Sequence, residues 1–190
     1  MNKIVPELIG HFYHCEGVGK SSLSDILESR DARALRQREL LGAYPGKTLI
    51  SFTVIPPGEV KRTGWSPVVA AEGLSALHER FTIIFEEKRD LPTGFEAFLV
   101  VDLPALEVKR ICCDIEDTHP LGRLMDIDVI TETRQDGALA EPSPRPMTRA
   151  EVGLPERRCL ICERPARECI RARRHTADEL LARYNEILKR

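Results

Sequence analysis

The sequence lacks a charge excess of either sign and has no long apolar run. Its 190 residues include 28 Lys and Arg against 30 Asp and Glu, which gives a formal net charge of −2. This balance excludes a polybasic protein that wraps nucleic acid, so we expect no nucleic-acid partner. No apolar segment approaches the ~18 residues that span a bilayer, and the first residues break before a signal-peptide core forms. We therefore expect no membrane partner and a cytoplasmic location.

The hydrophobic fraction of 42% is enough for a sizeable core in a chain of this length. The chain therefore suits one large domain, or one domain with an appendage. Six cysteines are present, and three of them crowd together near the C-terminus. This distribution indicates reduced thiols or metal ligands more than a disulfide framework.

Residue patterns predict an α+β fold with a mixed or mainly antiparallel sheet and helices packed on it. A serine N-cap before residue 23 and the Ser66-Pro67 pair are helix start signals. Runs of β-branched and aromatic residues between prolines and glycines predict strands, and short connections between strands favour antiparallel pairing. The predicted helices are 23–42 and 67–80, and the predicted strands are 47–55, 82–88, 96–102, 106–116 and 124–131.

The prolines divide the chain into three predicted parts. Four of the thirteen prolines lie within residues 138–158, which we interpret as a linker or a wrapped loop. This segment separates a catalytic core, residues 1–137, from a small Cys- and Arg-rich tail, residues 159–190. In the tail, Thr176 and Glu179 form a capping-box pattern that predicts a terminal helix.

The segment 119–130 contains the most informative motif, an Asp-x-Asp on a predicted strand. Because side chains alternate along a strand, Asp126 and Asp128 share one face. Two neighbouring carboxylates repel unless a cation lies between them, and oxygen ligands of this kind suit Mg²⁺. Asp114 or Glu116, on the predicted strand before it, is a candidate third carboxylate. The alternative is that the pair is the solvated face of an edge strand.

Residues suited to phosphate binding lie beside this pair and earlier in the chain. Gly122 permits close backbone approach, and Arg123 can fork onto phosphate oxygens beside a metal. Arg30 and Arg33 lie on one face of the first predicted helix, where guanidinium groups suit a polyphosphate. Lys61 follows a buried strand, in a loop position that often carries function. A solvated charged face is the alternative for the helix.

The tail contains cysteines with the spacing of a metal site. Cys159 and Cys162 form a C-x2-C pair, and Cys169 and His175 complete a tetrahedral Cys₃His set for a structural Zn²⁺. Plain reduced cysteines and a redox pair are the alternatives. Residues 156–174 also hold seven arginines against three glutamates, a basic surface that suits an acidic partner or an anionic ligand.

Four segments are distinctive when taken together. They are S-R-D-x-R-x-x-x-Q at 29–37, S-F-T-V-x-x-P-G-x-x-K at 51–61, H-P-L-G-R-L-x-D-I-D-V at 119–129, and R-R-C-L-x-C-E at 157–163 followed by Cys169 and His175. With them the chain resembles, over about residues 20–190, the citrate lyase holo-acyl-carrier-protein synthases, the apo-citrate lyase phosphoribosyl-dephospho-CoA transferases. The third segment is the most specific.

The resemblance implies transfer of the phosphoribosyl-dephospho-CoA group from its precursor, triphosphoribosyl-dephospho-CoA. The acceptor is a serine of the apo acyl-carrier subunit of citrate lyase, and diphosphate is released. This is nucleotidyl-type transfer, and Gly122-Arg123 followed by Asp126-x-Asp128 is broadly similar to the glycine-serine and D-x-D signature of nucleotidyltransferases. A nucleotidyltransferase-like fold is therefore one expectation.

The implied chemistry gives each candidate residue a role. Asp126 and Asp128 would hold Mg²⁺, and Arg123 would clamp the phosphates whose charge the metal neutralises. His119 or a nearby carboxylate would take the serine proton. The outgoing diphosphate would be bound by the cationic residues Arg30, Arg33 and Lys61.

Two other functions fit parts of the sequence. A zinc-stabilised nucleic-acid or protein interaction module would use the Cys₃His tail and its arginines, and its binding to nucleic acid would fall steeply with salt. A nucleotidyltransferase acting on a small nucleotide would use the same aspartate pair without any carrier protein. The overall acidity of the chain counts against nucleic-acid binding.

Overall fold

The computed structural model describes residues 21–58, 60–133 and 143–189. Within these ranges five strands form one sheet in the order β2-β3-β1-β4-β5, and every neighbouring pair is antiparallel. The prediction of an α+β fold with a mainly antiparallel sheet is confirmed. The strands are β1 (Thr48–Val54), β2 (Ile83–Leu91), β3 (Gly94–Val101), β4 (Met125–Thr133) and β5 (Ser143–Pro146).

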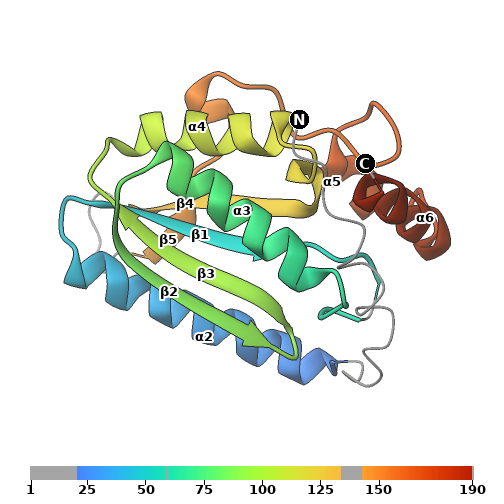
Figure 1. Ribbon diagram of the computed structural model, residues 1–190, viewed down its shortest axis with the longest axis horizontal. Coiled ribbons are helices and arrows are strands. Elements are labelled where there is room, and N and C mark those ends of the chain that lie inside the picture. The colour runs from blue at the N-terminus through green and yellow to red at the C-terminus, as the bar shows by residue number, and fades with distance from the viewer. Residues whose placement is uncertain (1–20, 59, 134–142, 190) are drawn as a thin grey trace.

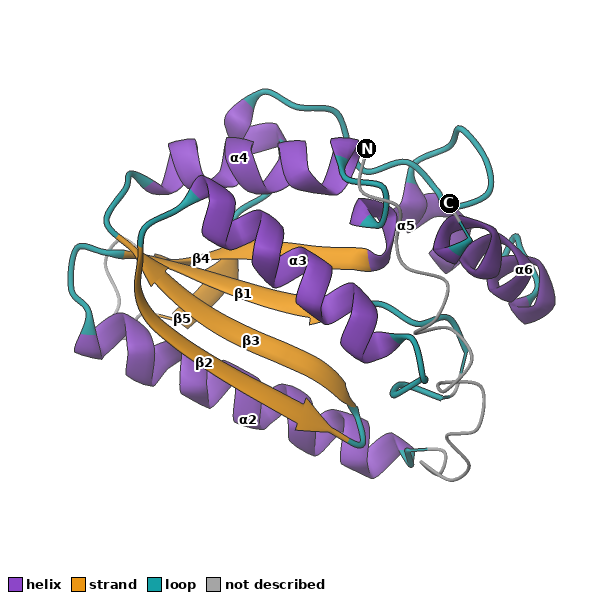
Figure 2. Ribbon diagram, in the orientation of Figure 1, coloured by secondary structure: helices purple, strands orange, loops and turns teal. Residues whose placement is uncertain are grey.

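Two helices connect strands across one face of the sheet. α3 (Ser66–Arg80) joins β1 to β2, and α4 (Ala105–Thr118) joins β3 to β4. The chain order β1-α3-β2-β3-α4-β4 is the arrangement of ferredoxin-like, split βαβ folds. Both helices cover the same face, and α2 (Leu23–Ala43) lies across the other face (Figures 1 and 2). A nucleotidyltransferase-like fold stays a prediction.

The face beneath α3 and α4 carries the main core. Alternate residues of the central strands, including Phe52 of β1 and Ile127 of β4, are fully buried on this face. Val69 of α3 and Val108 of α4 pack against them and are equally buried. The burial of these apolar side chains is the main force that holds both helices on the sheet.

The opposite face, beneath α2, has a polar half and an apolar half. Glu96 of β3, Thr53 of β1 and Asp126 of β4 occupy one row across three strands, and Ser51 and Asp128 lie in the next row. The C-terminal end of α2 covers the apolar half. The buried residues there are Leu40, Leu49, Phe98, Val100 and Ile130.

α2 confirms the predicted helix 23–42 and meets the polar half of the sheet with polar side chains. It begins at the N-cap Ser22, which forms a capping box. Arg33 Nε donates to the buried carboxylate of Glu96 at 2.6 Å, and Gln37 donates to Ser51 Oγ at 3.2 Å. This helix is therefore attached to the sheet by hydrogen bonds at one end and by apolar contacts at the other.

The predicted strand 106–116 is wrong, because this segment lies within α4. The buried positions include Val108, Cys112 and Ile115, which are spaced by four and three as on one face of a helix. β-Branched residues in the segment favour a strand locally. The segment is nevertheless a helix, because α4 connects β3 to β4 across the sheet and buries one apolar face against it. Asp114 and Glu116 therefore project from a helix.

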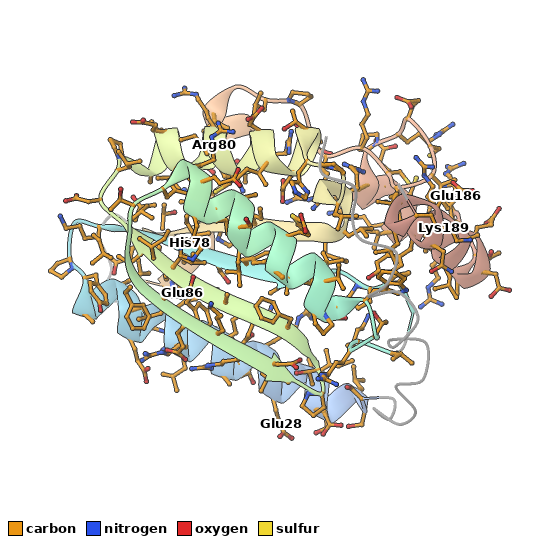
Figure 3. The ribbon with its side chains drawn as sticks, viewed as in Figure 1. Glu28, His78, Arg80, Glu86, Glu186 and Lys189 are labelled. Atoms are coloured by element: carbon orange, nitrogen blue, oxygen red, sulfur yellow. The ribbon has the colours of Figure 1, made fainter. Side chains whose placement is uncertain are left out.

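Charged side chains cover the outer surface of the fold (Figure 3). His78 Nε2 lies 2.6 Å from Glu86 Oε2 and links α3 to β2, and Arg80 donates to Asp114 at 2.8 Å and links α3 to α4. No helix among the described residues is long and apolar enough to cross a membrane.

The described part of the C-terminal third packs onto the sheet. Residues 138–142 of the predicted connection 138–158 lie outside the described residues. The described part of this connection contains β5, which pairs with the end of β4. Met147 and Val152 are buried in the main core. α6 (Ala177–Leu188) begins with the capping box predicted at Thr176 and places Tyr184 in the same core. The boundaries at 137 and 158 stay predictions.

Candidate active site at the edge of strand β4

The first half of β4 lies at an edge of the sheet, where charged side chains take the place of a neighbouring strand. β5 pairs only with residues 130–133, so residues 125–128 have no strand on that side. Instead, Ile127 N–H donates to Glu116 Oε1 at 3.0 Å, and the Ile127 carbonyl accepts from Lys109 Nζ at 3.5 Å. The Met125 carbonyl accepts from Arg157 at 2.7 Å. Backbone groups that another strand would normally pair are thus bound by charged groups.

A cavity of about 440 Å³ lies against this edge and contains both aspartates of the predicted pair. α4, β4, the segment that follows β5 and the start of the Cys-rich tail form its walls. Acidic and basic side chains line it in equal number. The acidic residues are Glu116, Asp126, Asp128 and Glu156, and the basic residues are Lys109, Arg149, Arg157 and Arg167.

The two aspartates each face one cation inside the cavity. Asp126 Oδ1 lies 3.5 Å from Arg157 Nη1, and Asp128 Oδ1 lies 3.4 Å from Lys109 Nζ. Burial raises the pKa of Asp128, and the negative charge of Asp126 raises it further. The expectation that the two carboxylates share one face is confirmed by the strand register, and both line this cavity. Their role in holding a cation stays a prediction.

Glu116 lies beside the pair but is occupied by other partners. Its Oε1 accepts from Ile127 N–H and lies 3.5 Å from Arg157, and its Oε2 lies 3.3 Å from Arg149. Burial raises the pKa of this carboxyl, although Arg157 acts in the opposite direction. No three carboxylates converge on a common point among the described residues. Glu116 therefore braces the wall, and Asp114 faces Arg80 on the outer surface.

The tail brings its predicted ligands together in a second site. One ligand atom from each of Cys159, Cys162, Cys169 and His175 lies within 4.8 Å of all the others. Cys162 Sγ and Cys169 Sγ are 3.6 Å apart, close to the roughly 3.8 Å separation that two thiolates on one tetrahedral zinc would have. The buried His175 Nε2 has no hydrogen-bond partner among the described residues. This group could hold a metal ion.

Comparisons with known proteins decide the family. The family model described as CitX, apo-citrate lyase phosphoribosyl-dephospho-CoA transferase, matches residues 21–190. The chain belongs to this family. The resemblance that the four sequence segments indicated is confirmed.

Curated relatives of the family match most of the chain. A probable apo-citrate lyase phosphoribosyl-dephospho-CoA transferase of Streptococcus pyogenes serotype M18 is 35% identical, over 87% of this chain and 84% of the relative. The apo-citrate lyase phosphoribosyl-dephospho-CoA transferase of Citrobacter koseri is 34% identical over 88% of each chain. That of Shigella boydii serotype 18 is 33% identical over 97% of this chain and 94% of its own.

Within the most specific family segment, Arg123 lies away from the aspartate cavity. Its guanidinium donates to the carbonyls of Arg158 at 2.5 Å and Cys159 at 3.3 Å, and it lines a different cavity beneath the tail. Burial lowers the pKa of this guanidinium. These contacts attach the tail to the turn before β4. The role of Arg123 as a phosphate clamp stays a prediction.

Two other residues of that segment have clear packing tasks. A Cβ at Gly122 would lie 2.5 Å from the carbonyl of Ile115 and 2.6 Å from that of Glu116, so the turn approaches the end of α4 as only glycine permits. His119 Nδ1 accepts from Leu121 N–H at 3.1 Å, and its Nε2 lies 3.7 Å from Glu72. Neither Gly122 nor His119 is among the residues that line the aspartate cavity.

The three cations predicted to bind diphosphate do not line that cavity either. Arg33 projects from α2 toward the sheet and pairs with Glu96, which is 1% exposed. Lys61 Nζ donates to the Gly58 carbonyl at 2.7 Å, and Arg30 is exposed on α2. Their role in binding diphosphate stays a prediction.

Sequence reasoning missed the cations that the structure does bring to the aspartates. Lys109 is 4% exposed and comes from the segment that was predicted as a strand. Its spacing of seven from Glu116, two helical turns, was the signal that would have placed both on one face of a helix. Arg157 belongs to the R-R-C-L-x-C-E segment, but its contacts with β4 depend on how the tail folds back.

Proposed function

We propose that this chain transfers the phosphoribosyl-dephospho-CoA group from triphosphoribosyl-dephospho-CoA to a serine of the apo acyl-carrier subunit of citrate lyase. The relatives are named for this transfer. The observation that carries the site assignment is that Asp126 and Asp128 open into one cavity together with four cationic side chains. A cavity that combines paired carboxylates with cationic hydrogen-bond donors suits a polyphosphate with its divalent metal.

The aspartate pair fits Mg²⁺ by its donor chemistry. Each aspartate contacts its cation through Oδ1 at 3.4–3.5 Å, longer than the roughly 2.7–2.9 Å of a charge-assisted hydrogen bond. Neither Oδ2 has a hydrogen bond to another described residue, so hard oxygen ligands are available on both side chains. A bound Mg²⁺ would neutralise charge on the phosphate oxygens during transfer. Lys109 and Arg157 would remain beside the metal and add positive charge near those oxygens.

The transfer is a displacement at the α-phosphorus of the precursor. The serine Oγ forms the new P–O bond, the bond to the leaving diphosphate breaks, and the serine proton goes to a base. A carboxylate of this cavity is better placed for that proton than His119, because His119 does not line the cavity. Arg149 and Arg167 supply positive charge where the diphosphate departs.

We also propose that the Cys₃His group holds a structural Zn²⁺. The four ligands are all protein side chains, which leaves no open position for catalysis. Zinc would hold the C-x2-C turn, the start of α5 (Ala166–Arg171) and His175 together. Because Arg157 and Arg123 join this tail to β4, the metal would support the aspartate cavity at a distance.

The test is transfer to the carrier subunit itself. The protein is incubated with Mg²⁺, triphosphoribosyl-dephospho-CoA and the apo acyl-carrier subunit, and the intact mass of the carrier is followed. The expected result is one added phosphoribosyl-dephospho-CoA group per carrier, dependent on Mg²⁺. An unchanged carrier mass would contradict the proposed function.

Aspartate variants test the site assignment. Asp126→Asn and Asp128→Asn are expected to lower the transfer rate by at least about 100-fold, since each removes an ionised metal ligand. Asp114→Asn is the matched control, because Asp114 carries the same group on the outer surface of α4 and should keep wild-type transfer. Wild-type rates in either cavity variant would reject the site.

A further inference from the structure

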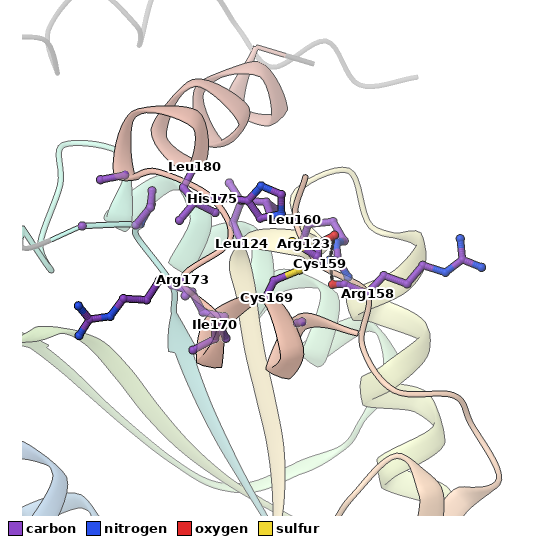
Figure 4. A pocket seen from close by; sticks show the side chains of 15 residues that line it. Arg123, Leu124, Arg158, Cys159, Leu160, Cys169, Ile170, Arg173, His175 and Leu180 are labelled. Atoms are coloured by element: carbon purple, nitrogen blue, oxygen red, sulfur yellow. Dashed lines mark hydrogen bonds between the residues drawn. The ribbon is translucent and has the colours of Figure 1, made fainter. Parts of the chain in front are cut away.

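A second cavity, of about 510 Å³, lies beneath the Cys-rich tail. Cys159, Cys169 and His175 of the proposed zinc site form part of its wall, and the transfer steps described above do not use the rest of it. Figure 4 shows its lining, which comes from the end of β1, the turn before β4, α5 and the start of α6. Its volume is within the range of small-molecule sites in proteins, roughly 300–1,000 Å³. The apolar side chains of its wall are Ile55, Leu124, Leu160, Ile170 and Leu180.

Arginines stand at the rim of this apolar wall. Arg158 and Arg173 both line the cavity, and their guanidinium groups extend outward on opposite sides of it (Figure 4). Arg158 pairs with Glu163 on the surface. Arg173 is exposed and forms no ion pair with any described residue. An apolar wall with free positive charge at its edge suits a ligand that is partly apolar and partly anionic.

The backbone of Arg173 is strained in a way that glycine would relieve. Its φ of 43° is left-handed, and it is the one non-glycine residue with positive φ in the described chain. It follows the end of α5, where Arg173 N–H donates to the Ile170 carbonyl at 3.2 Å and Arg174 N–H donates to the Cys169 carbonyl at 3.0 Å. This is the Schellman helix end, whose left-handed position is usually glycine. The arginine costs about 1 kcal/mol there, which indicates a use for its side chain.

The two cavities are neighbours separated by a thin wall. Ala166, the first residue of α5, lines both of them. Arg157 lines the aspartate cavity, and the next residue, Arg158, lines the apolar cavity. A single ligand that passes over this wall would therefore have one end beside the aspartates and the other end against the apolar residues.

We propose that the apolar cavity binds the dephospho-CoA half of the precursor, while its triphosphate end lies in the aspartate cavity. This inference rests on the proposed function, because the name of the family supplies the precursor. Dephospho-CoA joins an adenine ring and an aliphatic pantetheine arm through a diphosphate. The ring and the arm suit the apolar wall, and the diphosphate suits the arginines at the rim, with Arg173 in the leading role.

Direct binding of dephospho-CoA, which lacks the triphosphate, tests this site in the full-length, zinc-loaded protein. Isothermal titration calorimetry is carried out on the wild type and on Arg173→Gly. The variant should bind dephospho-CoA about tenfold or more weakly, because it loses a charge-assisted hydrogen bond. Its Tm should stay equal or rise, because glycine relieves the strain. Arg174→Gly removes the same charge from the next residue, which does not line the cavity, and should bind as the wild type does.

The apolar wall is tested in the same way with a matched isoleucine pair. Ile170 is 73% exposed and lines the cavity, so Ile170→Glu should leave stability nearly unchanged while it places a negative charge beside the ligand. We expect weaker binding of dephospho-CoA by about tenfold. Ile161→Glu, on an exposed tail residue that does not line the cavity, should bind normally.

The outcomes separate this proposal from the proposed function. Absence of dephospho-CoA binding to the wild type, or equal binding by Arg173→Gly and Ile170→Glu, would overturn the cavity assignment. Asp126→Asn should lose transfer but keep dephospho-CoA binding, since it lies in the other cavity. If the wild type binds dephospho-CoA in the apolar cavity but does not modify the carrier, the proposed function is rejected while the binding site is supported.

Discussion

Arg123 and Arg157 hold each other's segments in a reciprocal pair of contacts. The Arg123 guanidinium donates to the carbonyls of Arg158 and Cys159, and the Arg157 guanidinium donates to the carbonyls of Gly122 and Arg123 at 3.3 and 3.2 Å. The turn before β4 and the start of the Cys-rich tail are thereby joined in both directions. Arg157 also reaches Asp126, so this junction sits directly beside the proposed metal ligands.

Removal of Arg157 should therefore affect both stability and transfer. Arg157→Ala leaves the Met125 carbonyl without its guanidinium donor and leaves Glu116 paired with Arg149 but no longer with Arg157. We expect a loss of about 1–3 kcal/mol in the free energy of unfolding. Urea titration measures this loss. Arg164→Ala, an exposed arginine of the same tail, is the control and should change stability by less than about 0.5 kcal/mol. Equal stability of the two variants would contradict a structural role for Arg157.

The close approach at Gly122 predicts that even a methyl group is destabilising there. Gly122→Ala would place its Cβ about 2.5 Å from backbone oxygens of α4 that cannot move independently, and we expect a loss of roughly 1–3 kcal/mol. Gly42→Ala is the control, because nothing lies within 4 Å of its added Cβ and a helical alanine is favoured. Thermal unfolding followed by circular dichroism should show Tm shifts of opposite sign. A Gly122→Ala protein as stable as the wild type would show that this turn is not tightly packed.

An ion pair after β5, between Arg145 and Glu151, should make the stability of the protein depend on pH in the acid range. Arg145, together with Thr148, lowers the pKa of Glu151 from 4.5 to about 2. A carboxyl whose folded pKa is lowered adds stability above its unfolded pKa and loses it as pH falls toward the folded value. Glu151→Gln should thus be less stable than the wild type at pH 7, by on the order of 1 kcal/mol after solvent screening.

The difference between Glu151→Gln and the wild type should shrink between about pH 4.5 and pH 2. Urea midpoints measured at pH 7 and at pH 3 give the comparison. Glu132→Gln provides an exposed carboxylate of the neighbouring strand as a control. A stability difference for Glu151→Gln that stays constant down to pH 2.5 would exclude Glu151 as the titrating group.

Elemental analysis tests the metal of the Cys₃His group. Protein purified without chelator should contain about one zinc per chain, and Cys162→Ser should contain less than half of that. Cys113→Ala removes a buried cysteine of α4 instead and should keep the wild-type zinc content. Less than about half a zinc per chain in the wild type rejects the site, and a Cys159–Cys162 disulfide found by mass spectrometry would favour the redox alternative.

Local sequence signals were sufficient for much of the fold. The serine and threonine caps of α2 and α6 and the proline at the start of α3 act within one helical turn, so these helix starts were predicted closely. The alternation of Asp126 and Asp128 with buried neighbours is equally local, because a strand alternates its side chains wherever it lies. The Cys₃His set could be predicted because its ligands are close in sequence.

Segment 106–116 shows where local signals fail. Its apolar and β-branched residues fit a strand or a helix about equally well, and the connection between β3 and β4 across the sheet decided for the helix. The same long-range packing turned Lys109 and Glu116 toward the edge of β4 and brought Arg157 back from the tail. These contacts join residues 11 to 32 positions apart, a separation over which local sequence patterns do not act.

The amino-acid sequence by itself determined the family, the aspartate pair on one strand and the four candidate ligands of the tail, because each depends on residue identity and short spacing. Only the tertiary structure decided which cations face the aspartates, that Arg123 joins the tail to the turn, and that two cavities share one wall. The physical reason is that charge pairing and cavity shape depend on distances in space, which arise only when α4 and the tail pack against the edge of β4.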